Sequence, residues 1–130
     1  MKRIIILTLT LIVTVICHAA SPSLACEKIF DRKDLRTEGH QLVKINQPNN
    51  YFRSITAEND KKLQNDIKKA FEQDRKKAYN VVEGYDGNSD REYSILNISS
   101  NGYVINIGFY WNMNGYVNLF IQSDPDAFEK

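Results

Sequence analysis

The chain has 130 residues, 42% hydrophobic and 25% charged, and its 17 Lys and Arg against 16 Asp and Glu give a formal net charge of +1. This length suits one domain, and the hydrophobic fraction excludes a disordered tail. The charge balance argues against a nucleic-acid-binding protein, because phosphate contacts need a clustered excess of Lys and Arg.

The N-terminus has the three parts of a secretory signal peptide. Lys2 and Arg3 form a basic head, residues 4–16 are an uncharged run of Ile, Leu, Val and Thr, and small residues follow. The apolar run is shorter than the roughly 20 residues that span a membrane. We therefore expect residues 1–25 to be cleaved and the protein to be periplasmic or secreted. Cleavage after Ala19 is the alternative.

Cleavage before Cys26 leaves this residue as the one thiol of the mature chain, so it cannot form an internal disulfide. Residues 23–26, Ser-Leu-Ala-Cys, resemble a bacterial lipobox, in which the Cys is acylated and becomes the mature N-terminus. Ala25 fits that pattern, whereas Ser23 and Leu24 depart from it. The resemblance implies lipid attachment to the envelope through Cys26, and the alternative is a soluble exported protein.

We expect residues 26–55 to form an N-terminal connector that belongs to the same domain as residues 56–130. Residues 41–45, Gln-Leu-Val-Lys-Ile, have a brief strand pattern, and a turn-rich cluster of Asn, Gln and Pro follows it. We expect one short strand and a loop there.

From Thr56 the spacing becomes helical. Thr56 suits an N-cap and Gly84 a helix end. Between them, apolar residues recur at spacings of three, four and seven: Leu63, Ile67, Ala70, Phe71, Ala78 and Val82. The sequence therefore predicts one long helix. In the following turn Asp86, Asn88 and Asp90 alternate like calcium ligands, but Arg91 and Asn97 replace the Gly and Glu that such a loop needs.

Residues 93–123 contain no charged side chain, and Asn101-Gly102 and Asn114-Gly115 are hairpin signals. The sequence predicts a three-stranded antiparallel meander. A two-residue first turn pairs Ile98 with Ile105. A three-residue second turn, with Gly115 in the left-handed conformation, pairs Trp111 with Val117 and keeps one face apolar.

The other face of this meander carries tyrosines and amides. Tyrosine offers a large contact area at low entropic cost, and amides both donate and accept hydrogen bonds, so such a surface suits protein partners or sugars. The alternative is that the N-terminal segment or a second copy of the chain covers it. The expected partner-binding residues are Tyr93, Asn97, Asn106, Tyr110, Asn112, Tyr116, Asn118 and Phe120.

Chemistry-bearing residues are scarce. His40 is the one histidine after the predicted signal peptide, and no nucleophile lies near it in the sequence. No catalytic, metal or cofactor motif occurs, so we expect a non-enzyme without a cofactor.

The sequence thus predicts an exported α+β domain in which one long helix packs on a three- to four-stranded antiparallel meander. Its expected function is that of an inhibitor or immunity-type protein of the bacterial envelope, with a toxin or hydrolase as the partner. The alternatives are a glycan- or peptidoglycan-binding module and a structural envelope lipoprotein, and homodimerisation stays open.

Overall fold

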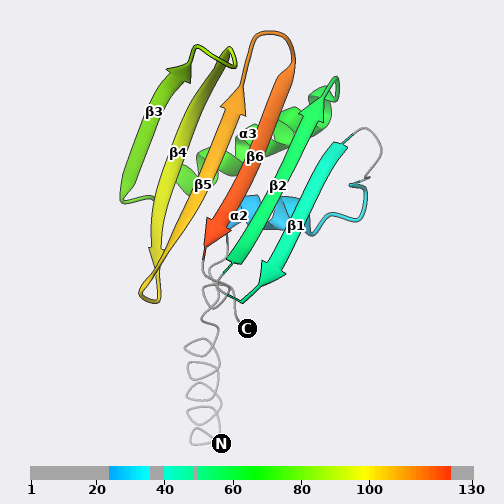
Figure 1. Cartoon of the computed structure of the whole chain (residues 1–130). Coiled ribbons are helices and arrows are strands. Elements are labelled where there is room, and N and C mark those ends of the chain that lie inside the picture. The colour runs from blue at the N-terminus through cyan, green and yellow to red at the C-terminus, as the bar shows by residue number, and fades with distance from the viewer. Residues whose placement is uncertain (1–23, 36–39, 49, 124–130) are drawn as a thin grey trace, which may run out of the picture.

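Alternating polar and apolar residues build a sheet from most of the chain, and two helical segments cover one side of it. The computed structural model describes residues 24–35, 40–48 and 50–123, so nearly all of the predicted signal peptide lies outside it. The described residues form a six-stranded antiparallel sheet with two helices on one face (Figure 1). The elements are α2 (Ala25–Phe30), β1 (His40–Gln47), β2 (Asn50–Glu58), α3 (Lys61–Arg75), β3 (Asn80–Asp86), β4 (Arg91–Ser100), β5 (Tyr103–Trp111) and β6 (Tyr116–Ser123).

The strand order in the sheet is β1-β2-β6-β5-β4-β3. β1 and β2 form a hairpin, and β3 to β6 form a meander whose last strand pairs with β2. Between these two parts, α3 carries the chain across the sheet from β2 to the far edge at β3 (Figure 1). Strands distant in the sequence, β2 and β6, therefore pair in the interior of the sheet.

The predicted architecture, one long helix on a three- to four-stranded meander, is wrong. The described residues hold six strands, and the longer helix, α3, has 15 residues. Thr56 pairs with Asn118 inside the sheet instead of capping a helix, and Gly84 lies in β3. The helical spacing of Ala78 and Val82 was misleading, because Val81 and Val82 are β-branched and lie in a strand, β3.

The segment that the sequence assigns to a connector is also more ordered than expected. It contains α2, all of β1 and most of β2. The predicted strand at residues 41–45 is present, but it extends over His40–Gln47 and turns back directly into β2. The segment in which Asp86, Asn88 and Asp90 alternate like calcium ligands is the turn between β3 and β4. There the Asp86 carboxylate accepts the backbone N–H of Asn88 at 3.0 Å.

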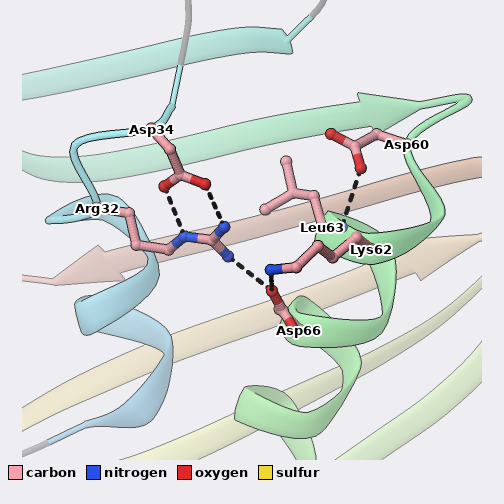
Figure 2. A network of polar contacts seen from close by, with 6 residues as sticks. All are labelled: Arg32, Asp34, Asp60, Lys62, Leu63 and Asp66. Carbon is pink, nitrogen blue, oxygen red and sulfur yellow. Dashed lines mark hydrogen bonds and ion pairs between the residues drawn. The ribbon is translucent and has the colours of Figure 1, made fainter.

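The first turn of α3 is fixed by polar contacts (Figure 2). Asp60 is the N-cap, and its Oδ1 accepts the backbone N–H of Leu63 at 3.1 Å. One turn on, Asp66 accepts from Arg32 Nη1 at 3.0 Å, and the same guanidinium binds Asp34. Arg32 therefore links the loop after α2 to α3 (Figure 2).

The core lies between the helices and the sheet. The α3 side chains Leu63, Ile67, Ala70 and Phe71 are buried, as their predicted helical spacing requires. The Phe71 ring stacks on Phe109 of β5 with 5.2 Å between ring centroids. α2 contributes Cys26, Ile29 and Phe30 to the same core.

The pairing predicted within residues 93–123 is confirmed. Ile98 pairs with Ile105, and Trp111 pairs with Val117. Asn101 and Gly102 both have positive φ, 53° and 84°, as a two-residue hairpin turn requires. Gly115 has φ of 87°, which is the left-handed conformation expected of it.

Candidate functional site: the open face of the sheet

The predicted partner-binding residues within β4, β5 and β6 alternate with the buried core residues, so they lie on one side of the sheet. Both helices lie on the other side (Figure 1). We call the side that carries the predicted residues the open face, and its strand residues form three rows across the sheet. One row is Gly84, Tyr93, Tyr110, Asn118 and Thr56; the next is Val82, Ile95, Gly108, Phe120 and Ser54; the third is Asn80, Asn97, Asn106, Gln122 and Phe52. Tyr116 and Asn112 follow at the β5–β6 turn. No helix or strand among the described residues covers this face.

Two glycines allow the aromatic rings to lie flat on the open face. A Cβ at Gly84 would collide with the Tyr93 ring, and a Cβ at Gly108 would collide with the Phe120 ring. The rings therefore occupy the space that side chains would otherwise fill. The Phe120 ring lies over Gly108, so this glycine leaves no hollow in the face.

The rings also contact each other. Tyr110 lies 5.5 Å from Tyr93 and 6.0 Å from Phe120, measured between ring centroids. Phe120 in turn stacks on Phe52 of β2 at 6.2 Å. Aromatic pairs in this range are mutually stabilising, and these contacts restrict the motion of each ring. The result is a continuous, partly exposed aromatic layer across β4, β5, β6 and β2.

The four asparagines among the predicted residues differ in their side-chain hydrogen bonds. Asn118 Nδ2 donates to Ser54 Oγ and Thr56 Oγ1, both at 3.0 Å, and so ties β6 to β2. Asn112 Oδ1 accepts from the turn that follows it. The side chains of Asn97 and Asn106 form no hydrogen bond with any described residue. They are opposite each other in β4 and β5, and their amides remain available to a ligand.

Charge on the open face is confined to one end. Arg91 and Asp86 lie where β3 meets β4, and Glu58 ends β2. The Arg91 guanidinium carbon lies 3.8 Å from the centroid of the Tyr116 ring, which is a cation–π contact. The remaining described positions on the face are neutral, so binding there would depend on ring contacts and amide hydrogen bonds.

The sequence prediction missed the contribution of β2 and β3 to this face. Phe52, Ser54 and Thr56 extend it beyond β6. Asn80 is a fourth amide in the row that already holds Asn97, Asn106 and Gln122. The available signal was the alternation in residues 51–57, where Tyr51, Ile55 and Ala57 are buried under the helices.

Cys26, the predicted lipidation residue, lies apart from the open face. Its side chain is 0% exposed within α2, and burial, followed by the nearby Asp74 carboxylate, raises the pKa of its thiol. Acylation of this sulfur would require α2 to leave the core. No helix in the described part of the chain is long and apolar enough to cross a membrane.

The described residues contain no group of three or more His, Cys, Asp or Glu that could hold a metal ion. No protein-family model, curated protein or solved structure matches this chain.

Proposed function

We propose that this chain is an exported, non-catalytic binding protein of the bacterial envelope, of the inhibitor or immunity type, which caps a protein partner with the open face. The observation that carries the proposal is the aromatic layer of Tyr93, Tyr110, Phe120 and Phe52. It is partly exposed, while the opposite face of the same sheet is packed against two helices.

The chemistry of the face favours a protein partner. Tyrosine and arginine are enriched where protein interfaces gain most of their binding energy, and the face carries three tyrosines and Arg91. The rings are already held against each other and over Gly84 and Gly108, so little conformational entropy is lost on binding. Neutral amides at Asn97 and Asn106 can pair with the backbone of a partner.

The experiment is affinity capture from an envelope extract of the cells that make the protein. We expect the wild-type chain to retain one protein partner and the variants Tyr110→Ala and Tyr116→Ala to lose it. Tyr79→Ala is the matched control, because Tyr79 is 62% exposed and lies outside the open face. Thermal unfolding of each variant separates a loss of contact from a loss of folding.

Two outcomes would contradict the proposal. Equal capture by wild type and both variants would exclude the open face as the contact surface. Sedimentation of the purified chain with isolated cell wall, without a protein partner and lost in Tyr110→Ala, would instead support the glycan-binding alternative for the open face.

A further inference from the structure

A cavity on the helix side of the sheet has the lining of a ligand site. Its volume is about 340 Å³, and it lies between α3 and the strands β4, β5 and β6, beside the β5–β6 turn. Small-molecule sites range over roughly 300–1,000 Å³, so the cavity is large enough for a small ring-shaped ligand.

The floor of the cavity is apolar and mainly aromatic. Phe71, Phe109 and Val117 line it together with Trp111, and the Phe109 and Trp111 rings stack with 5.2 Å between centroids. Trp111 is half-buried, while Phe109 and Val117 each keep 8% exposure in a core where their neighbours Ile107 and Leu119 have none. A ligand in the cavity would therefore reach chiefly the Trp111 ring.

Two amide side chains at one end of the cavity are held rigidly. Gln64 Nε2 donates to the carbonyls of Ala57 and Gly115, both at 2.9 Å, so its Oε1 is left as an acceptor. Asn112 Oδ1 accepts the backbone N–H of Asn114 at 2.9 Å and that of Tyr116 at 3.2 Å, which leaves its NH2 group as a donor. Both amides bind the same turn, so they present an acceptor and a donor in fixed positions beside the aromatic floor.

The charges around the cavity cancel. Lys68 and Arg75 are balanced by Glu72 and Glu83, and Arg75 Nη2 lies 3.3 Å from Glu83 Oε1. The hydroxyl of Ser94 also donates to Glu83, at 3.1 Å. A lining without net charge does not favour an anion or a cation, and its polar rim does not suit a lipid chain.

We infer that this cavity binds a neutral saccharide. A sugar ring has a C–H face that packs on aromatic rings and hydroxyl groups at its edge that both donate and accept. The half-buried ring of Trp111 matches the first property, and Gln64 Oε1 with the Asn112 NH2 group matches the second. The cavity shares Asn112 and Tyr116 with the end of the open face, but none of Tyr110, Phe120 and Phe52 lines it. Tyr110→Ala therefore tests the proposed function without touching the cavity, so the two can fail separately.

The experiment uses the fluorescence of Trp111, which is the only tryptophan in the chain and lines the cavity. The probes are three neutral disaccharides: cellobiose, maltose and N,N′-diacetylchitobiose. We expect a saturable change in emission with at least one of them, and saturation-transfer NMR of the disaccharide should show contact with the protein. Absence of binding by all three in both measurements would overturn the inference.

Asn112→Asp tests the proposed contact. The aspartate keeps the acceptor for the turn but removes the NH2 donor, so affinity should fall by about three- to tenfold with little change in stability. Asn114→Asp is the matched control, because Asn114 belongs to the same turn and does not line the cavity. Unchanged affinity in a folded Asn112→Asp variant would overturn the proposed site. If that variant does not fold, Gln64→Lys, which retains donors for the two carbonyls and lacks the acceptor, gives the same test.

Discussion

The buried carboxylate of Asp74, near the end of α3, accepts the backbone N–H of Cys26 at 2.8 Å. Its other oxygen accepts the N–H of Ala25, also at 2.8 Å, and the Asp74 side chain is 0% exposed. The first N–H groups of a helix have no partner within that helix and favour negative charge nearby. Asp74 therefore acts as the cap of α2 from a different helix, which fixes the start of α2 to α3.

Replacing Asp74 by Ala should be strongly destabilising. The variant leaves the N–H groups of Ala25 and Cys26 without acceptors inside the protein, and each charged hydrogen bond is worth about 1.5–3 kcal/mol. We expect the free energy of unfolding to fall by about 3 kcal/mol, as measured by urea denaturation. Gln73→Ala, at an exposed neighbouring position, is the control and should change it little. Equal stabilities for the two variants would contradict the capping role.

The same contact leads to a prediction about cleavage of the predicted signal peptide. Leu24 is 1% exposed in the core, and Ala25 is bound to Asp74, so cleavage before Cys26 would remove two residues that hold α2 in place. We expect the mature protein to retain both and to begin at Ala20, after the alternative cleavage position. Intact-mass measurement of the protein isolated from the cells that make it tests this, and a mature chain that begins at Cys26 would refute it.

Glu27 should make stability depend on pH in the acidic range. Its Oε1 accepts from the Tyr51 hydroxyl, whereas its Oε2 is buried without a partner among the described residues. Burial raises the pKa of this carboxyl above its ordinary value of 4.5. The folded state therefore holds the proton more tightly than the unfolded state, and the contribution of Glu27 to stability is lost as the pH rises from about 4.5 through the raised pKa.

The measurement compares the wild type with Glu27→Gln, which does not titrate. The free energy of unfolding of the wild type should decline relative to that of the variant as the pH rises from acidic to neutral values. Urea denaturation at several pH values gives both curves. Parallel curves would mean that the two states bind the Glu27 proton equally well.

The parts of the fold that could be predicted are those set by local signals. Asn101-Gly102 and Asn114-Gly115 fix two hairpins between neighbouring strands, so the register of β4, β5 and β6 follows from side-chain alternation alone. The pairing of β2 with β6 joins residues more than 50 positions apart, and no local signal encodes it. The open face could accordingly be predicted on three strands, and its extension over β2 could not.

The wrong prediction of where the helix begins and ends has a similar origin. The apolar spacing within α3 is truly helical, as its buried residues Leu63, Ile67, Ala70 and Phe71 show. Such spacing does not specify where the helix begins or ends. Thr56 suits an N-cap and also suits a strand, because it is β-branched. Its neighbours Ile55 and Ala57 pack under α3 from β2, and this burial outweighs the capping preference.

Asp60→Ala tests where the helix starts. Removal of the side chain that accepts the N–H of Leu63 should lower the free energy of unfolding by about 1 kcal/mol. Glu58→Ala, two residues earlier at the exposed end of β2, is the control and should have a smaller effect. Thermal or urea unfolding separates the two. If Glu58→Ala were the more costly change, the helix would begin earlier than Lys61.

Gly108→Ala tests whether the aromatic layer depends on the space over glycine. The added methyl group would overlap the Phe120 ring, while the backbone at position 108 has no positive φ that would itself disfavour alanine. Overpacking of this kind typically costs about 1–3 kcal/mol. Gly87→Ala is the control, because the nearest atom there, in the Tyr85 ring, lies 3.7 Å from the new methyl group.

Phe120→Ala in the Gly108→Ala background should remove the clash, so the double variant should be more stable than the sum of the single effects implies. Additive losses in urea denaturation would show that Phe120 does not occupy the space over Gly108, and the aromatic layer would then need a different explanation.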